Sequence, residues 1–344
     1  MSVATAGELH RRALAESERG RHRQARRLLT SALRAAPDPL LRARVLISLA
    51  YHEAERHSLA AGLAVLAEAD AIPDLPRRTR ALVHSQRGLL RMRAGAYDDA
   101  LADLDATLRL LDESTPEDLC RALLNRYLIH ETRRNLALGR ADLVRCVDVA
   151  DRHGLDIIAA KATHNLGCLL LLAGDLPAAL RQIDSVSAVL TGLSGPSAAV
   201  HHVDRSGILV AAGLTREADG DLARAVELFG AAGIRQDQAE AELARAQVAA
   251  AEERWEDAVR LATTARRRFR SRGAEVWVLL AELVAVSARV GSGRVSAATV
   301  AAAVRLAGAL AAAGLPDESR RAALTAAAAE LSRTRAAPAA RAAA

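Results

Sequence analysis

A short phrase recurs along this sequence at a nearly constant interval, and it constrains the fold more than any other feature. Each copy has a turn residue followed, five positions later, by a small residue; the clearest copies run from Gly95 to Ala100 and from Gly174 to Ala179. The aligned small residues are Ala25, Gly62, Ala100, Gly139, Ala179, Ala218 and Ala258, at intervals of 37, 38, 39, 40, 39 and 40 residues. A repeat of this length predicts a stacked array of helix pairs, in which each pair covers an apolar face of the next.

The composition favours helices throughout the array. Ala, Leu, Arg and Glu dominate, and aromatic residues make up 2% of the chain, which leaves few of the residues that strands prefer. At 344 residues the chain exceeds the usual size of a single core, and an elongated array satisfies this limit by adding core locally. The fold class that we predict is therefore all-α.

The turns have local reasons of their own. Gly20, Gly95 and Gly174 follow a helix and can adopt positive φ. Asp98 and Asp175 are expected to accept hydrogen bonds from free N–H groups at the start of the next helix. Prolines, which lack an N–H donor, fall between the predicted repeats, at Pro37, Pro73, Pro76, Pro116 and Pro196.

The phrase fades after Gly273, which predicts three regions. Residues 1–273 form about seven repeats, and residues 274–334 form a degenerate helical repeat followed by a helix, from about residue 316 to 333, that caps the array. Residues 335–344 are expected to be a disordered tail or linker.

Charge and cysteine usage exclude several classes of function. The formal net charge is +6, but acidic and basic residues are interleaved and no basic stripe with stacking aromatics accompanies them, so we expect no nucleic-acid partner. The three cysteines, Cys120, Cys146 and Cys168, lie in helical patterns without metal-ligand spacing. The first residues lack the apolar segment of a signal peptide, and no apolar run reaches the length that spans a bilayer. We predict a cytoplasmic protein without a membrane partner.

Catalytic, cofactor and metal sites are not expected. The cysteines occupy packing positions, whereas a nucleophilic thiolate needs an exposed site beside an imidazole. His201 and His202 are adjacent on a helix and point about 100° apart, so they cannot share one ion with Asp204. We therefore predict that the chain is not an enzyme.

The recurring phrase resembles the tetratricopeptide repeat. In that family a small residue in the first helix lets the second helix pack closely, and Gly88 and Gly167 lie seven residues before their turn glycines, as the motif requires. Residues 165–167 read Asn-Leu-Gly like the family's core, whereas Tyr127 departs from it. The resemblance implies a right-handed α-solenoid of about eight antiparallel helix pairs. The period exceeds the family's usual length of about 34 residues, which predicts longer helices or longer connections.

The same resemblance implies a concave groove lined by first-helix positions. Aligning the second, fifth and ninth positions of the repeats nominates Arg44, Ile47, Tyr51, Leu89, Arg121, Leu124, Leu128, Lys161, His164 and Cys168 as partner-binding residues, and places Glu240, Leu243 and Gln247 at the same positions of a later repeat. The basic members could contact an acidic segment; a solvated helix face is the equal alternative. For His164, a packing role is the leading interpretation. Trp255 and Trp277 are expected to fill gaps between repeats.

Longer phrases resemble the repeat array of bacterial CHAT proteins, in which tetratricopeptide repeats precede a caspase-like peptidase domain. These phrases lie at Leu46–Arg56, Glu117–Arg126, Ala160–Gly167 and Arg235–Glu242. The resemblance implies the sensing or regulatory half of such a system without its peptidase domain. A caspase-like domain or its regulator would then be the partner.

Two further classes of function compete with a protein-interaction scaffold. One is the peptide-sensing arm of a transcriptional or signalling regulator, which would be expected to carry a helix-turn-helix distinct from the repeats; none is evident in the sequence. The other is a peptidase remnant, which would need a nucleophile domain that the sequence does not offer. The leading hypothesis is a non-catalytic scaffold that binds a peptide or protein. The partner's identity and the oligomeric state are not predicted.

Overall fold

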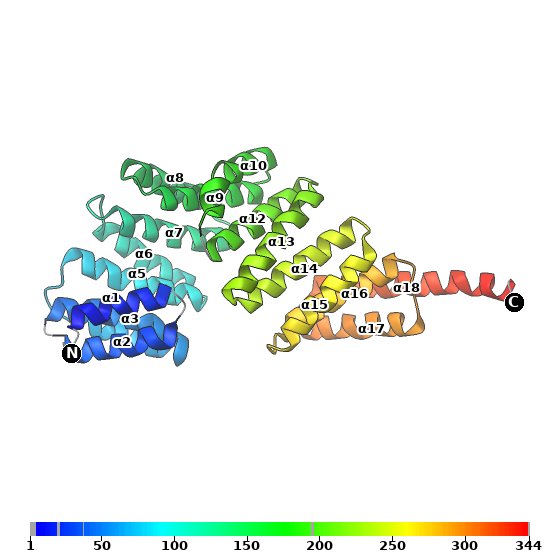
Figure 1. Cartoon of the computed structure of the whole chain (residues 1–344), viewed down its shortest axis with the longest axis horizontal. Coiled ribbons are helices and arrows are strands. Elements are labelled where there is room, and N and C mark those ends of the chain that lie inside the picture. The colour runs from blue at the N-terminus through cyan, green and yellow to red at the C-terminus, as the bar shows by residue number, and fades with distance from the viewer. Residues whose placement is uncertain (1–4, 19–20, 37, 194–195, 343–344) are drawn as a thin grey trace. The chain divides into compact units, whose positions relative to one another are not determined.

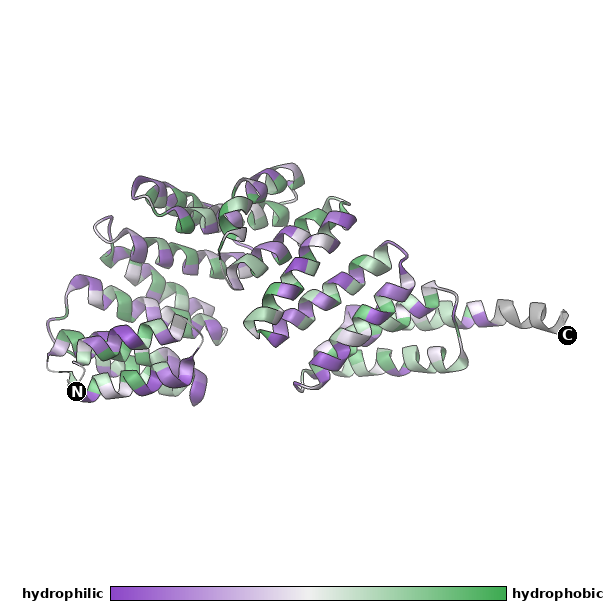
Figure 2. Cartoon of the chain, in the orientation of Figure 1, coloured by the Kyte–Doolittle hydropathy of each residue, from purple (hydrophilic) through white to green (hydrophobic). Residues whose placement is uncertain are grey.

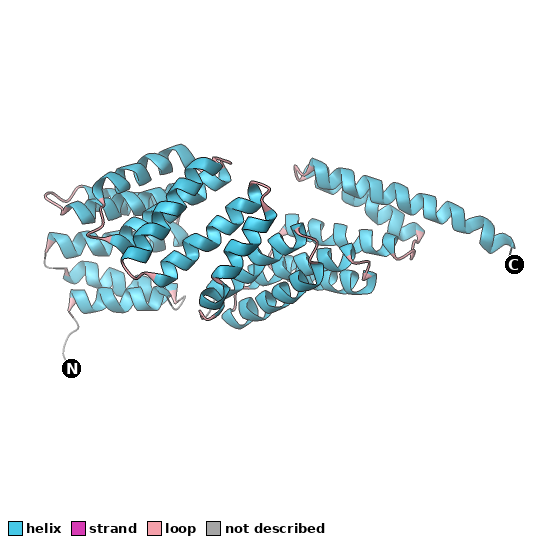
Figure 3. Ribbon diagram, turned by 90° about the horizontal axis from the view of Figure 1, so that it is seen from above, coloured by secondary structure: helices cyan, strands magenta, loops and turns pink. Residues whose placement is uncertain are grey.

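The computed structural model describes residues 5–18, 21–36, 38–193 and 196–342. Over these residues it contains 18 α-helices and no strand, with short loops between the helices (Figures 1 and 3). The chain divides into two compact units, Met1–Leu169 and Leu170–Ala344. The prediction of an all-α fold is confirmed.

The first unit consists of consecutive helical hairpins. Within each hairpin the two helices pack along their length, and each hairpin also contacts the next. Its helices are α1 (Ala6–Glu18), α2 (His22–Ala35), α3 (Pro39–Arg56), α4 (Leu59–Asp70), α5 (Arg77–Arg93), α6 (Tyr97–Leu110), α7 (Pro116–Thr132), α8 (Leu136–Arg152) and most of α9 (Asp156–Leu172).

The second unit continues the alternation of first and second helices. After the end of α9 it contains α10 (Leu176–Ser185), α11 (Ser187–Thr191), α12 (Pro196–Ala211), α13 (Thr215–Ala232), α14 (Arg235–Ala251), α15 (Trp255–Arg270), α16 (Glu275–Gly291), α17 (Ala297–Ala312) and α18 (Pro316–Ala342). Hydrophobic and hydrophilic residues are interleaved along the helices, as expected where one side of each helix packs and another meets solvent (Figure 2).

The recurring small residues lie where two helices approach. All seven, from Ala25 to Ala258, are buried. A Cβ atom added to Gly62 would come within 2.7 Å of the Ala50 carbonyl oxygen, and one added to Gly88 would come within 3.1 Å of Leu104 Cγ. The steric role predicted for these positions is therefore confirmed.

Tyr127, which departs from the family pattern, is accommodated by a change in its partner helix. It occupies the position of Gly88 in its own repeat, and its side chain is 1% exposed. The facing small residue of α8 is Gly139, where an added Cβ would lie 3.4 Å from Tyr127 Cδ2. A large residue on one helix is thus paired with the smallest on the other, which preserves the packing volume.

The turns follow the predicted chemistry at most copies of the phrase. Gly95 and Gly174 have φ of 77° and 83°, and the Asp175 carboxylate accepts a hydrogen bond from the Ala178 N–H at 3.1 Å. Asp98 was expected to cap α6 but does not; its carboxylate instead pairs with Arg133 Nη1 at 2.7 Å, because α6 begins at Tyr97 and places Asp98 inside the first turn. Gly20 and Pro37 lie outside the described residues.

The long period is explained by long helices. α7, α8 and α14 have 17 residues each, while the turn between α7 and α8 comprises residues 133–135. One second helix is interrupted: α10 ends at Ser185 and α11 begins at Ser187. The hydroxyl groups of Ser185 and Ser187 donate to the carbonyl oxygens of Gln182 and Ile183 at 2.7 and 3.1 Å, a contact that competes with regular helix geometry.

Arginines at the repeat interval join successive hairpins within each unit. Arg87 of α5 donates to Asp103 of α6 at 2.9 Å and to Asp70 of the preceding α4 at 3.0 Å. Arg126 of α7 contacts Asp142 of α8 at 2.9 Å and Asp105 of α6 at 2.7 Å. We call these residues the bridging arginines.

The second unit has the same arrangement. Arg205 of α12 contacts Asp221 of α13 at 2.6 Å and Asp184 of α10 at 2.7 Å. Arg245 of α14 reaches back to Asp219 of α13 at 2.8 Å. One repeat interval after Arg126 the chain has Leu166 instead, in α9, the helix that contains the boundary between the two units. The bridging arginines were not anticipated from the sequence, although their spacing of 39, 79 and 40 residues could have revealed them.

At the C-terminal end, α18 packs against α17 and α16, with Ala322 buried beside Leu306 and Leu310. The helix continues to Ala342, which differs from the disordered tail expected from residue 335. Alanine and arginine favour this extension of the helix, whereas Pro338 within the segment removes one backbone hydrogen bond. None of the helices in the described ranges is both long and apolar enough to cross a membrane.

Candidate binding groove

Three first-position helices of the second unit, α14, α16 and α18, form a groove of about 690 Å³. α16 contacts both α14 and α18, so the groove is formed by three first helices that lie side by side, with α16 in the middle. It is lined by Glu240, Leu243, Ala244, Gln247, Ala250, Trp277, Leu280, Leu283, Val284, Ser287, Glu318 and Arg321.

The residues that line the groove recur at the spacing of the repeats. Glu240, Leu243 and Gln247 are the second, fifth and ninth first-helix positions of their repeat, the positions that the alignment assigned to the concave wall. Forty residues later, Leu280, Leu283 and Ser287 line the same groove from α16. Equivalent positions of two repeats therefore face one space.

The floor of the groove is apolar and its edges are charged. Leu243 and Leu283 are nearly buried, and Leu280 and Val284 are partly exposed. Glu240 and Glu318 contribute carboxylates, and Arg321 contributes a guanidinium. The Ser287 and Thr325 hydroxyl groups lie 3.2 Å apart and connect α16 to α18. An apolar floor with a few polar groups is typical of ligand-binding surfaces.

The two tryptophans have different surroundings. Trp277 stacks on the buried Phe269, with ring centroids 5.3 Å apart and planes at 20°, and also lines the groove. Trp255 packs against Gly291, where an added Cβ would come within 2.7 Å of the indole ring. Both therefore fill gaps between helices, and Trp277 in addition offers an aromatic surface to a ligand.

The partner-binding residues predicted from the sequence all lie in the first unit or at its edge, and their exposure varies. Exposed members are Arg44, Arg121, Leu128 and Lys161; partly exposed members are Ile47, Tyr51, Leu89, Leu124 and Cys168. Arg93 lies over the Tyr51 ring, 5.2 Å from its centroid. His164 is 6% exposed, and its Nε2 lies 3.8 Å from Cys168 Sγ, as expected of a packing histidine. That these side chains line one wall remains a prediction.

The remaining chemical candidates form structural contacts. His201 Nε2 lies 2.9 Å from Ser187 Oγ, whereas His202 Nδ1 lies 2.8 Å from Asp221 Oδ1, so the two rings point to different partners as the helical geometry requires. Cys120 and Cys146 are buried against each other between α7 and α8. The contact with Cys120, together with burial, raises the pKa of the Cys146 thiol, which keeps it protonated and a poor nucleophile.

The residues of α16 and α18 were missed by sequence reasoning, because the recurring phrase fades after Gly273. The signal that could have found them is the interval itself. Gly293 has a φ of 74°, 40 residues after the turn residue Glu253, but α17 begins later, at a capping box formed by Ser296 and Thr299. α17 begins four residues after its turn residue, whereas α15 begins two residues after Glu253. These two extra residues shift the small-residue position and hide the repeat.

The fold is similar to solved tetratricopeptide-like structures. A Rap protein solved in complex with the competence and sporulation factor has a TM-score of 0.61 at 12% identity, covering 97% of this chain and 98% of that one. The apo form of the quorum sensor NprR from B. thuringiensis has a TM-score of 0.58 at 12% identity, covering 94% and 97%. A tetratricopeptide repeat protein from Parabacteroides merdae has a TM-score of 0.53 at 16% identity, covering 80% and 98%.

These similarities confirm the tetratricopeptide-like solenoid fold. No family model matches the sequence, and no curated protein matches it.

Proposed function

We propose that this tetratricopeptide-like chain is a non-catalytic scaffold that binds a peptide or protein segment along its first-helix faces. The observation that carries the proposal is the groove of α14, α16 and α18, where equivalent positions of successive repeats line one apolar floor. The similarity to a Rap protein solved with a bound factor supports the same function.

The chemistry of the groove suggests the kind of segment that fits. Leu243, Leu280 and Val284 would take apolar side chains, and Trp277 would take an aromatic or basic one. The carboxylates of Glu240 and Glu318 favour a segment with a basic residue beside its apolar anchors. An amphipathic segment with anchors on one face has this pattern.

Peptide binding in the groove of α14, α16 and α18 is tested by a substitution on the floor of the groove and a matched control on the same helix. Leu280→Asp places an unpaired carboxylate in the apolar floor, so we expect peptides selected from a displayed library to bind it at least about tenfold more weakly. Val276→Asp is the control, because Val276 is 42% exposed on α16 and does not line the groove.

Trp277 supplies a direct readout. In a Trp255→Phe background it is the remaining tryptophan, and its emission should change on peptide binding. Equal loss of binding in Leu280→Asp and Val276→Asp, or binding with no change in Trp277 emission, would place the peptide elsewhere.

In the first unit we propose Arg44, Arg121 and Lys161 as contacts to an acidic segment. Their exposure leaves them accessible, and the weak pair of Arg121 with Glu117 at 3.9 Å leaves its charge available. Reversing all three to glutamate should abolish capture of acidic peptides and leave binding in the groove of the second unit intact. Capture that is unaffected would contradict this part of the proposal.

Two biological settings follow from different observations. The CHAT-like phrases favour the sensing or regulatory half of a CHAT-type peptidase system, with a caspase-like domain or its regulator as partner. The similarity over nearly the whole length of a Rap protein and a quorum sensor favours the alternative, a peptide-sensing arm of a transcriptional or signalling regulator. Co-purification with a caspase-like domain encoded beside this chain would favour the first; binding of a short free peptide alone would favour the second.

A further inference from the structure

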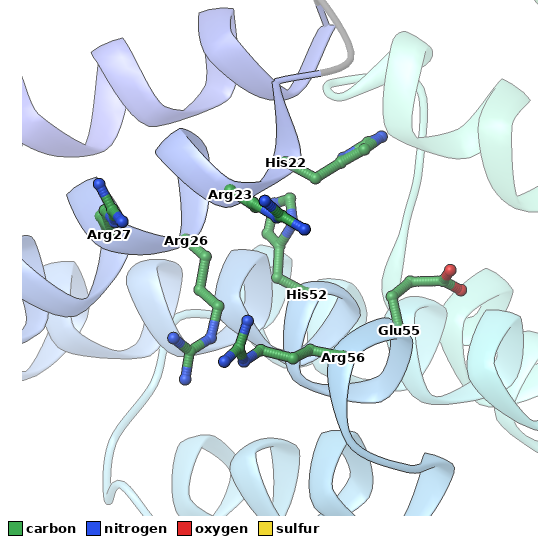
Figure 4. A pocket seen from close by; sticks show the side chains of 7 residues that line it. All are labelled: His22, Arg23, Arg26, Arg27, His52, Glu55 and Arg56. Atoms are coloured by element: carbon green, nitrogen blue, oxygen red, sulfur yellow. The ribbon is translucent and has the colours of Figure 1, made fainter.

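A second hollow, chemically unlike the groove, lies between α2 and α3 in the first unit. Its volume is about 340 Å³. The first turns of α2 contribute His22, Arg23, Arg26 and Arg27, and the end of α3 contributes His52, Glu55 and Arg56 (Figure 4). Four guanidinium groups and two imidazoles thus surround one small space.

Nearby carboxylates compensate only part of the positive charge of the four guanidinium groups. Arg26 Nε is held by Glu53 Oε1 at 2.7 Å, and the Glu55 carboxylate is engaged by Arg93 at 2.8 Å. Figure 4 shows the side chains of Arg26 and Arg56 directed toward each other, with the Glu55 carboxylate pointing away from them. Arg23, Arg27 and Arg56 are exposed, and none of them makes an ion pair with a residue in the described ranges.

The three arginines of this hollow differ in their partners from most of the bridging arginines. Arg87 and Arg126, for example, each contact two aspartates, whereas Arg23, Arg27 and Arg56 pair with none in the described ranges. Gathering three unpaired guanidinium groups around one hollow costs electrostatic free energy, and an anion would remove that cost.

The start of α2 also suits an anion. No side chain of the described residues caps the N-terminus of α2, and the first turn of α2 has no acidic residue, so the positive end of its dipole is not neutralised. The rings of His22 and Tyr51 lie near His52, with centroid distances of 5.7 Å and 5.4 Å from the His52 ring. His52 is 5% exposed and lines the hollow.

We propose that this hollow, defined by His22, Arg23, Arg26, Arg27, His52 and Arg56, binds a phosphate monoester group. A phosphate dianion has three terminal oxygens that accept charge-assisted hydrogen bonds, and guanidinium groups match its geometry better than other cations do. A metal ion is disfavoured, because the imidazoles that could ligate it lie among arginines. The hollow is compact and takes one phosphoryl group, whereas a nucleic acid would need an extended basic track.

The phosphate can come from a phosphorylated protein side chain or from a free phosphate compound, and the experiment separates these sources. Inorganic phosphate is titrated at constant ionic strength while the imidazole resonances of His22 and His52 are followed by NMR. Saturable shifts of both are expected. A short peptide containing phosphoserine, compared with its unphosphorylated form, then tests the protein source by calorimetry.

The variants are matched in charge. Arg23→Gln combined with Arg56→Gln should weaken phosphate binding by about tenfold or more, since two charge-assisted contacts are lost. Arg34→Gln combined with Arg80→Gln removes the same charge from exposed positions of α2 and α5 outside the hollow, and should change the affinity by less than about twofold. Circular dichroism of both double variants checks that they fold.

The outcomes show whether the hollow binds phosphate and which source supplies the phosphate group. Competition between phosphoserine peptide and inorganic phosphate supports a phosphorylated partner, and binding of inorganic phosphate alone supports a free phosphate compound. No saturable shift in the wild-type chain, or equal weakening in the two double variants, overturns the proposal. Because none of these measurements involves the groove of α14, α16 and α18, they do not depend on the function proposed for that groove.

Discussion

Arg134 and Glu253 hold a left-handed backbone at turns where other repeats have glycine. Their φ angles are 58° and 59°, against 77° for Gly95 and 83° for Gly174. A side chain makes this conformation unfavourable by about 1–2 kcal/mol. The surrounding helices impose the turn geometry, and the residue at the turn tolerates it.

Replacing Arg134 by glycine should therefore stabilise the chain. We expect a gain of about 0.5–1 kcal/mol in the free energy of unfolding, because relief of backbone strain exceeds the extra entropy of an unfolded glycine. Urea denaturation measures the change. The control is Gly154→Ala, for which a loss of about 1 kcal/mol is expected at the same kind of turn. A loss of stability in Arg134→Gly would show that its side chain, not its backbone, matters.

At the scale of helices, Arg87, Arg126 and Arg205 each join a first helix to the second helices on both sides, and Arg245 joins α14 to the preceding α13. The carboxylate of Asp142 is 5% exposed and that of Asp103 is 5% exposed, while the arginines are 21–22% exposed. The hydrogen bonds that Arg126 donates to Asp142 raise its pKa, and burial, the next largest effect, opposes this increase. These pairs are thus more protected from solvent than ordinary surface ion pairs.

Removing one residue of the Arg126–Asp142 pair should lower the free energy of unfolding strongly, whereas removing both residues should not. Arg126→Leu leaves the Asp142 carboxylate buried without its cation, so we expect a loss of about 3 kcal/mol. Arg126→Leu combined with Asp142→Leu should recover most of this loss. Arg224→Leu, which removes an exposed pair with Glu227, is the control and should change stability by less than about 0.5 kcal/mol. Similar losses in the single and double variants would contradict the account.

At the scale of the whole molecule, the first unit contains three histidines buried in neutral form. Burial lowers the pKa of His10, with the charge of Arg44 adding to the effect. Burial also lowers the pKa of His52, with His22 contributing, and that of His130 despite the attraction of Asp142. His130 Nδ1 is, in addition, a buried nitrogen without a hydrogen-bond partner in the described residues.

These shifts predict that acid destabilises the first unit. A lowered histidine pKa means that the unfolded chain binds protons at a higher pH than the folded chain does. Stability is therefore complete above the unfolded value of about 6.5 and falls as the pH drops below it. The free energy of unfolding, measured in urea at pH 7.5, 6.5 and 5.5, should decrease as the pH falls, and hydrogen exchange should locate the loss in α1, α3 and α7. His130→Leu should make the decrease shallower; an unchanged slope, or greater stability at pH 5.5, would contradict this prediction.

The sequence by itself determined the helix pairs, their interval and the close contacts at Ala100, Ala179 and their equivalents, because these features depend on local conformation and on side-chain size at one recurring position. It also predicted the helices that follow Gly273, within a few residues of α16, α17 and the start of α18.

Only the tertiary structure decided which surfaces face a common space. The exchange of size between Tyr127 and Gly139, the groove of α14, α16 and α18, and the arginine-rich hollow of α2 and α3 all join residues from different helices. Their positions depend on how the helices pack, and the pattern of apolar and polar residues along one helix does not determine that packing. The physical reason is that local propensity acts over a few residues, whereas a binding surface is built from side chains that only packing brings together.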